Sequence, residues 1–255
     1  MKSNSKSKIL FIDVETSPNL SYIWGHYEQN ALEVEEPWFL MSYSAKWLGG
    51  KQETKCLMDY DGYKNALTDD VDLVNDVWKL LNEADIVIAH NGDKFDIKKL
   101  NTRFIFNGLT PPEPYRTIDT LKIAKRHFAF NSNRLDDLGE FLGLGRKIET
   151  HKKLWFDCMI GDQKAWEKMK KYNAQDVKLL EKVYFEFLPW ISNHPNLGMY
   201  SDELVCPKCG SDDIQFRGYS MNQTTKYRRF MCNSCGGWGR ATHNERTEKP
   251  LINGN

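Results

Sequence analysis

Residues 8–14, KILFIDV, decide the fold because they form a short apolar run, rich in branched side chains, that ends where acidic residues begin. Such a run is typical of a buried strand. Asp13 and Glu15 lie at its carboxyl end. Side chains two positions apart on a strand point to the same face, so we expect both carboxylates to converge on one cation. A solvated loop that begins with acidic residues is the alternative.

The chain up to residue 189 alternates in the manner of a layered α/β domain. Runs of strand composition occur at 21–26, 38–47, 53–59 and 85–89, and Gly49-Gly50 marks a turn between two of them. Apolar residues recur at helical spacing within 71–81, from 93 to 104, within 135–142 and from 162 to 187, before Pro189. Strands at the start and in the middle, with helices between and after them, predict a mixed sheet flanked by helices.

A second polar element, His90-Asn91-Gly92-Asp93-Lys94-Phe95-Asp96, directly follows the predicted strand 85–89. An apolar strand that leads into a glycine turn and then a helix places Asn91 and Asp96 at the carboxyl end of the strand, where α/β folds keep their sites. The alternative is a plain turn, in which Asn91 caps its own backbone and Asp96 stabilises the first helical turn.

A third element, Tyr172-Asn173-Ala174-Gln175-Asp176, lies within the long predicted helix. Tyr172 and Asp176 are four residues apart and therefore share one face of that helix. An exposed pair is the alternative. Between the second and third elements, we expect Asp119 to cap a helix or to support the site from behind, and Asp136 and Asp137 to be solvated.

In this order, the three elements resemble the exonuclease motifs of the DEDD superfamily, which includes the proofreading domains of DNA polymerases and has a ribonuclease H-like fold. Thr16 after the first pair and Tyr172 in the third motif are most similar to the branch that uses tyrosine, including family B polymerase exonuclease domains. Position 171 is Lys, so the histidine branch has no candidate here. The pattern spans residues 8–189.

The resemblance implies two Mg²⁺ or Mn²⁺ ions, with Asp13 bridging both, Glu15 and Asp176 completing one site, and Asp96 supporting the other. Tyr172 would orient the attacking water or help to deprotonate it. Two hard cations with oxygen ligands supply what phosphodiester hydrolysis needs, namely an activated water and neutralised charge on both oxygens. The candidates for substrate contact in these motifs are Thr16, Asn91 and Phe95.

Four of the six cysteines form two Cys-x-x-Cys pairs, Cys206 with Cys209 and Cys232 with Cys235, separated by 22 residues. Two such pairs, each followed by glycine, are typical of a zinc ribbon that holds one structural Zn²⁺. A redox role is the alternative, and it would normally accompany a single pair near a βαβ pattern.

Basic and aromatic residues alternate between the two cysteine pairs, a composition that suits contact with phosphates and stacking on bases. We expect nucleic-acid contacts from Arg217, Lys226, Arg228 and Arg229. The alternative is that a small module needs its aromatic residues for a core and its basic residues for solubility.

The charge distribution agrees with this division. Net charge is zero, but from residue 205 onward the chain has eight Lys/Arg and four Asp/Glu, which leaves 27 Lys/Arg and 31 Asp/Glu in the preceding residues.

No segment approaches the roughly 18 apolar residues of a membrane span, and the cysteines do not form a disulfide framework. We therefore expect a soluble protein in a reducing compartment, the cytoplasm, or the host cytoplasm if the source is a virus. We predict a disordered basic tail at 1–7, the exonuclease domain at 8–190, a linker at 191–204, the zinc ribbon at 205–240 and a flexible tail at 241–255.

Together these features predict a metal-dependent 3′-to-5′ exonuclease that releases nucleoside 5′-monophosphates from single-stranded DNA or 3′ ends. An exoribonuclease of the same superfamily is the alternative enzyme. A non-catalytic nucleic-acid-binding protein is the alternative from another class, and loss of any of the four carboxylates would favour it, but all four are present. Nucleic acid, DNA rather than RNA, is the expected partner, no membrane is expected, and a protein could also dock on the ribbon.

Overall fold

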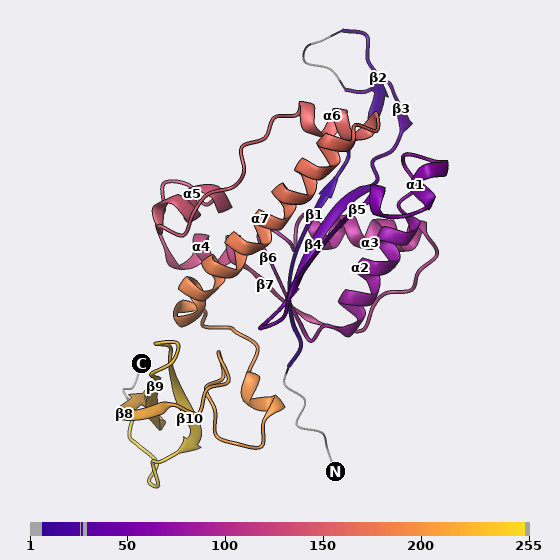
Figure 1. The fold of residues 1–255 in the computed structure, drawn as a ribbon. Coiled ribbons are helices and arrows are strands. Elements are labelled where there is room, and N and C mark those ends of the chain that lie inside the picture. Colours follow the sequence, from indigo (N-terminus) through magenta and orange to yellow (C-terminus); the bar gives the residue numbers. More distant parts are fainter. Residues whose placement is uncertain (1–6, 26, 28–29, 253–255) are drawn as a thin grey trace. The chain divides into compact units, whose positions relative to one another are not determined.

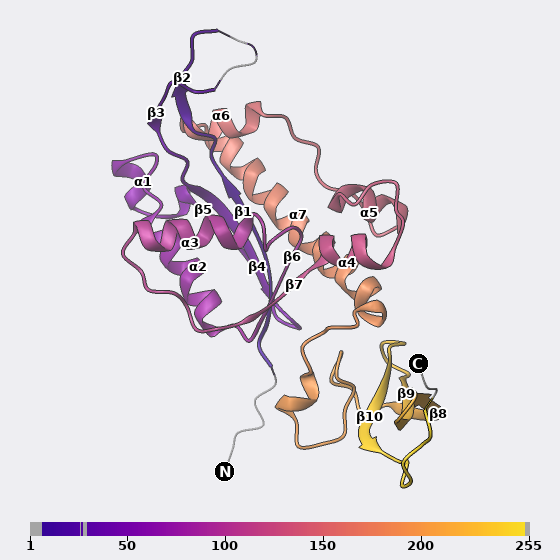
Figure 2. The same ribbon diagram turned by 180° about the vertical axis from the view of Figure 1, so that it is seen from behind.

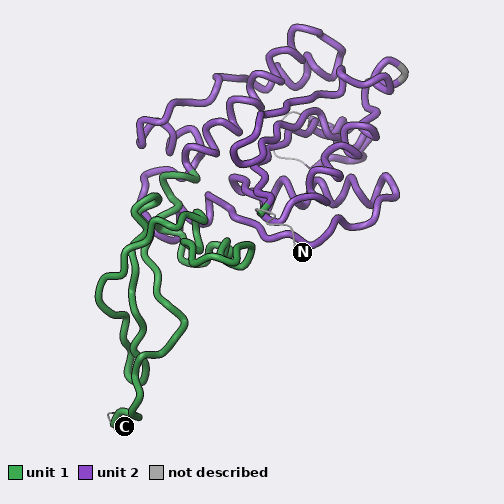
Figure 3. The backbone as a smooth tube through the Cα atoms, turned by 60° about the horizontal axis from the view of Figure 1, so that its bottom comes forward, with its two compact units in different colours: residues 1–7, 184–255 green, residues 8–183 purple. Residues whose placement is uncertain are grey.

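The computed structural model describes residues 7–25, 27 and 30–252. It divides into two compact units (Figure 3). The larger unit is Lys8–Val183, and the smaller comprises Tyr184–Asn255 with the residues before Lys8. Within the described residues, no helix has both the length and the apolar character needed to cross a membrane.

The larger unit is built on a five-stranded mixed sheet with the order β5-β4-β1-β6-β7 (Figure 1). The strands are β1 (Ile9–Thr16), β4 (Leu40–Trp47), β5 (Gln52–Cys56), β6 (Ile86–Ala89) and β7 (Arg116–Asp119). β1 pairs antiparallel with β4 and parallel with β6, while β4 pairs antiparallel with β5 and β6 parallel with β7. The apolar run that begins at Ile9 is thus the central strand, and the predicted mixed sheet is confirmed.

Helices cover both faces of this sheet (Figures 1 and 2), with α2 and α3 on one side and α7 on the other. The helices are α1 (Gly62–Asn65), α2 (Val71–Glu83), α3 (Asp96–Phe106), α4 (Thr120–His127), α5 (Leu135–Phe141), α6 (Lys153–Met159) and α7 (Gln163–Phe187). Alternate residues of β1, Leu10, Ile12 and Val14, are buried in a cluster with side chains of α2 and α3. The residues between them, including Asp13, therefore point to the other face, because side chains alternate along a strand.

Several parts of this unit differ from the prediction. The strand expected at 53–59 is β5, which ends at Cys56, and Leu57–Asp59 forms a 3-10 turn. The strand expected at 21–26 is only β2 (Leu20–Tyr22), which pairs with β3 (Glu33–Glu36) in a separate two-stranded sheet; residue 26 lies outside the described residues. Other elements were not predicted, among them β3, β7, α4 and α6. They are short, and their sequences are rich in charged residues or lack a clear apolar period. β7, for example, has the sequence Arg-Thr-Ile-Asp.

The smaller unit contains a three-stranded antiparallel sheet with the order β10-β9-β8. Its strands are β8 (Ile214–Met221), β9 (Lys226–Cys232) and β10 (Trp238–Asn244), the last running past residue 240. The segment predicted as a linker, 191–204, contains the 3-10 turn Leu197–Tyr200 and buries Ile191 and Leu197. The N–H of Leu197 donates to the carbonyl of Pro207 at 2.8 Å, so this segment is bonded to the cysteine-bearing loop of its own unit.

A buried ion pair attaches α3 to the sheet. Nη2 of Arg103 lies 2.5 Å from Oδ1 of Asp70, and both side chains are almost fully buried. The other oxygen of Asp70 accepts the N–H of Leu40, the first residue of β4, at 2.8 Å. The pair therefore connects the helix that begins at Asp96 with a strand that pairs with β1.

Replacing Arg103 with Met is expected to lower the free energy of unfolding by about 3–5 kcal/mol, because it leaves the Asp70 carboxylate buried and unpaired. Urea unfolding measures this change. The double variant that adds Asp70→Asn removes the charge and keeps an oxygen for Leu40, so it should recover much of the loss. An Arg103→Met protein within about 0.5 kcal/mol of the wild type would contradict the proposed role of the pair.

Candidate active site

Three predicted carboxylates meet at the carboxyl end of β1. Asp13 and Glu15 project from β1 toward α7, where Asp176 is completely buried. One carboxylate oxygen from each of the three lies within 4.8 Å of the others. The structure thus brings together side chains that are more than 160 residues apart in the sequence.

Asn173 fixes the orientation of Asp13. Its Nδ2 donates to Oδ2 of Asp13 at 2.6 Å and to the carbonyl of Asp13 at 3.2 Å. Its Oδ1 accepts from the hydroxyl of Ser42 at 3.1 Å, which sets the position of the amide. Asn173 is fully buried, so helix α7 contributes a positioning amide as well as a carboxylate. Asn173 lies within the third motif, but the sequence alone indicated no role for it.

Asp96 is held beside these carboxylates by a tight turn. Asn91 adopts a φ of 65°, and its carbonyl accepts the N–H of Phe95 at 3.0 Å. A Cβ on Gly92 would lie 2.4 Å from that of Ala89, so only glycine fits this turn. Asp96 then begins α3, and its Oδ1 accepts the N–H of Val14 at 3.1 Å. Asp96 is not among the three carboxylates that lie within 4.8 Å of one another.

Asp119, at the end of β7, supports this turn from behind. Its Oδ1 accepts the N–H of Leu121 at 3.0 Å and that of Asn91 at 2.8 Å. The first bond caps α4, which confirms the predicted capping role. The second bond holds Asn91, the residue with positive φ in the turn after β6. The neighbouring strand β7 thus helps to fix the turn that leads into α3.

Lys147 enters the site from the loop between α5 and α6. Its Nζ lies 2.5 Å from Oδ2 of Asp176 and 3.3 Å from the hydroxyl of Tyr172. Its backbone N–H donates to Oδ1 of Asp136 at 2.7 Å, and Oδ2 of Asp136 accepts from Arg146 at 3.0 Å. The prediction that Asp136 is merely solvated is therefore wrong, since it anchors the loop. Lys147 was not predicted as a site residue, because an Arg-Lys pair in a glycine-rich loop has the composition of a solvated surface.

The electrostatics of the site follow from burial and from repulsion between like charges. Burial, followed by the nearby charge of Asp176, raises the pKa of Glu15 to about 8. Burial likewise raises the pKa of Asp96 to about 7. It raises the pKa of Asp13 well above its ordinary value, and the charges of Asp176, Asp96 and Glu15 raise the pKa of Asp13 further. Lys147 opposes these shifts, yet the pKa of Asp176 is still raised by burial. Around neutral pH, the positive charge near these carboxyl groups is therefore too small to keep all of them ionised.

These residues fit divalent metal ions. Mg²⁺ and Mn²⁺ prefer carboxylate oxygens, and Oδ1 of Asp176 is buried without a hydrogen-bond partner among the described residues. Cations at this position would stabilise the charged carboxylates, which burial and nearby like charges disfavour. Asp13, Glu15 and Asp176 would hold metal directly, and Asp96 lies beside them to support a second ion.

Tyr172 lies one helical turn before Asp176 on α7 and is buried. Its ring packs edge-on against Trp155, with 5.9 Å between ring centroids. Burial, followed by the charges of Asp176 and Glu15, raises the pKa of the phenol. The hydroxyl therefore stays protonated at neutral pH, which suits it to positioning a water by hydrogen bonding.

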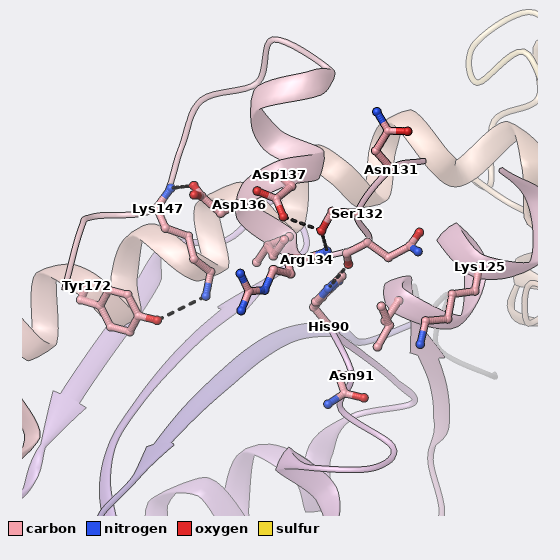
Figure 4. A pocket seen from close by; sticks show the side chains of 13 residues that line it. His90, Asn91, Lys125, Asn131, Ser132, Arg134, Asp136, Asp137, Lys147 and Tyr172 are labelled. Atoms are coloured by element: carbon pink, nitrogen blue, oxygen red, sulfur yellow. Dashed lines mark hydrogen bonds between the residues drawn. The ribbon is translucent and has the colours of Figure 1, made fainter. Parts of the chain in front are cut away.

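A cavity of about 780 Å³ opens beside Tyr172 and Lys147 (Figure 4). Its walls are mostly polar or basic and include Asn91, Lys125, Asn131, Ser132, Arg134 and Lys147. His90 links two of the segments that line the cavity. Its Nδ1 forms a hydrogen bond with the hydroxyl of Thr120 at 2.9 Å, and its Nε2 forms one with the carbonyl of Asn133 at 3.0 Å. Burial lowers the pKa of His90 to about 4, so its ring is neutral.

Of the residues predicted to contact substrate near the carboxylates, Asn91 lines the cavity, while Thr16 and Phe95 do not. Thr16 follows an irregularity in the pairing of β1 with β4, directly after Glu15. The ring of Phe95 is 39% exposed beside Asp96, and Nζ of Lys99 lies 5.8 Å from its centroid.

The four paired cysteines gather in the smaller unit. Their sulfur atoms lie within 4.8 Å of one another, with Cys206 at 3.8 Å from Cys235 and Cys209 at 3.6 Å from Cys232. Four thiolates at about 2.3 Å from one ion would have sulfur atoms about 3.8 Å apart, so the cluster fits a tetrahedral Zn²⁺. Nζ of Lys208 also bonds to the carbonyl of Pro189, which ties the first pair to the segment after α7.

The comparisons with known proteins agree with this architecture. A family model described as the RNase_H superfamily matches residues 10–187, so the chain belongs to the ribonuclease H superfamily. Among solved structures, it is similar to the family B DNA polymerase from the hyperthermophilic archaeon Pyrobaculum calidifontis, with a TM-score of 0.55 and 14% sequence identity. The match covers 72% of this chain and 25% of the polymerase chain, and at this identity it shows a shared fold. No curated protein matches.

Without added divalent metal, the protein is expected to lose stability as pH rises from about 4.5 to about 8. In this range the folded state retains the proton on Glu15, whose pKa is about 8, while the unfolded chain has released it. Thermal unfolding at several pH values measures the trend. Mg²⁺ should restore stability at pH 8, by about 2.7 kcal/mol at 100 times its dissociation constant.

Glu15→Gln is the control for this prediction. It removes the titrating carboxyl, so stability should fall less steeply with pH and respond less to Mg²⁺. A variant with the same dependence on pH and Mg²⁺ as the wild type would exclude Glu15 as the source.

Proposed function

We propose that this protein is a divalent-metal-dependent 3′-to-5′ exonuclease that removes nucleoside 5′-monophosphates from DNA. The observation that carries the proposal is the convergence of Asp13, Glu15 and Asp176 beside Asp96 and Tyr172. Bound metal ions would supply an activated water and neutralise charge on the attacking and leaving oxygens of the phosphodiester. Membership in the ribonuclease H superfamily is compatible with nuclease activity.

The side chains around the carboxylates have separate roles in this proposal. Asn173 holds Asp13 in a fixed orientation, as its two bonds to that residue indicate. The protonated phenol of Tyr172 positions the attacking water and does not remove its proton, in keeping with its raised pKa. Lys147 balances the charge of Asp176 when metal is absent and places its ammonium group at the cavity, where it can contact a phosphate.

The cavity beside Tyr172 suits the 3′-terminal part of a nucleic acid strand. Lys125, Arg134 and Lys147 provide positive charge for phosphates, while Asn131 and Ser132 offer hydrogen-bonding groups. These groups serve DNA and RNA alike, so an exoribonuclease is the second candidate. A non-catalytic binding protein is less well supported, because the four carboxylates are costly to bury and would have no use without metal.

Asp13→Ala and Asp176→Ala are each expected to reduce hydrolysis by several orders of magnitude, because each removes a carboxylate that would bind metal. The assay uses DNA and RNA oligonucleotides labelled at either end, with and without Mg²⁺. A 5′-labelled strand should shorten to a ladder, whereas a 3′-labelled strand should release its label as a mononucleotide.

Circular single strands and folding provide the controls for this assay. Circles have no 3′ end and should resist the enzyme, so efficient cutting of circles would indicate an endonuclease. Circular dichroism should show that both variants are folded. Wild-type turnover by either folded variant would refute the proposed site.

Tyr172→Phe should have a milder effect, because it removes one hydroxyl and leaves every carboxylate in place. We expect a rate reduction of about 10² to 10⁴. The dependence of the remaining rate on Mg²⁺ concentration should be unchanged. If the variant matched the wild type across pH, the phenol would have no catalytic role.

A further inference from the structure

The three-stranded sheet of the smaller unit has two different faces, which the strand register defines. In β9, Arg229 pairs with Arg240, whereas its neighbour Phe230 pairs with Gly239 of β10 and with Phe216 of β8. Because side chains alternate along a strand, Arg229 and Phe230 point to opposite faces. We call the side with Arg229 the arginine face; its residues are Arg217, Tyr227, Arg229, Trp238 and Arg240.

The opposite face is used for packing within the module. Phe230 is 7% exposed, and its ring lies edge-on to Phe216 with centroids 6.3 Å apart. A Cβ on Gly239 would lie 2.4 Å from the ring of Phe230, so β10 approaches this ring closely. Arg228 lies over Phe216 at 4.2 Å and is also 3.9 Å from Glu245, which partly neutralises it.

On the arginine face, aromatic rings hold two guanidinium groups in place. Arg229 lies 4.8 Å from the ring centroid of Trp238, and Arg240 lies 3.9 Å from that of Tyr227. Nε of Arg229 also donates to the carbonyl of Arg217 at 3.2 Å. A guanidinium stacked on a ring is already ordered and still presents N–H groups at its outer edge, so little side-chain entropy is lost when it binds a phosphate.

The charge of this face is not balanced locally. The sequences of β8, β9 and β10 contain no Asp or Glu. Trp238 is 46% exposed and offers a planar surface at the edge of the sheet. Arg217, Arg229 and Arg240 form no ion pair among the residues that the structure describes. Three such cations complement a polyanion, and an exposed indole complements a base.

We propose that the arginine face binds single-stranded nucleic acid, with Arg217, Arg229 and Arg240 contacting phosphates and Trp238 stacking on a base. This inference takes only the class of ligand, nucleic acid, from the proposed function. Of the four basic residues expected to contact nucleic acid, it assigns Arg217 and Arg229 to the binding face and places Lys226 and Arg228 on the opposite face. It also adds Trp238 and Arg240.

The test compares two triple variants that lose the same number of charges. In the full chain carrying Asp13→Ala, which prevents degradation, Arg217, Arg229 and Arg240 are replaced by Gln; the matched control replaces Lys226, Arg228 and Arg246. Fluorescence anisotropy measures binding of a labelled single-stranded oligonucleotide at several salt concentrations. Bound zinc and thermal unfolding are measured for each protein to show that the module is intact.

We expect the arginine-face variant to bind about 10- to 100-fold more weakly, with a salt slope smaller by about 2, because three phosphate contacts are lost. The control should bind within about threefold of its parent. Trp238→Ala should weaken binding by about 5- to 150-fold and leave the salt slope unchanged, because it removes stacking rather than charge. Trp238→Phe should retain most of the affinity.

Equal weakening by the two triple variants would overturn the proposal, because binding would then depend on overall charge alone. Unchanged binding in both would also overturn it and would leave the face to a protein partner. The two proposals can fail separately. If wild-type protein hydrolyses no oligonucleotide but the triple variants differ as expected, the exonuclease proposal fails and the binding face stands.

Discussion

The cost of removing four neighbouring carboxylates from water dominates the energetics of the site. Asp13, Glu15, Asp96 and Asp176 all have raised pKa values, mainly because they are buried. Keeping such groups close costs stability, and only surrounding structure and added positive charge can offset that cost. Lys147 supplies one positive charge, and the pKa values stay raised despite it, which is why we propose that divalent cations complete the site.

The fold places these groups by making β1 central and α7 long. β1 lies between β4 and β6. Asp13 accepts hydrogen bonds from Asn173 of α7, and the N–H of Val14 donates to Asp96 at the start of α3. One helix supplies the phenol of Tyr172, the amide of Asn173 and the carboxylate of Asp176. Because α7 crosses the same face of the sheet toward which Asp13 points, its middle turns meet the end of β1.

Much of this could be predicted from the sequence because the deciding residues lie in regular elements. The run around Ile12 indicated a buried strand, and the four-residue spacing from Tyr172 to Asp176 indicated a shared helix face. Lys147 could not be found, because its position depends on how Asp136 anchors an irregular loop. The two faces of the cysteine-bearing sheet were also hidden, since composition alone does not give the register of three short strands.

Anomalous diffraction from crystals grown with Mn²⁺ would show whether the four carboxylates bind metal. We expect two Mn²⁺ ions about 3.5–4 Å apart, bound by Asp13, Glu15 and Asp176 with Asp96 beside them, and Lys147 moved away from Asp176. We also expect Zn²⁺, and not Mn²⁺, among the four cysteines. Crystals without Mn²⁺ at Asp13, in which Lys147 still paired with Asp176 at saturating metal, would contradict the proposed metal site.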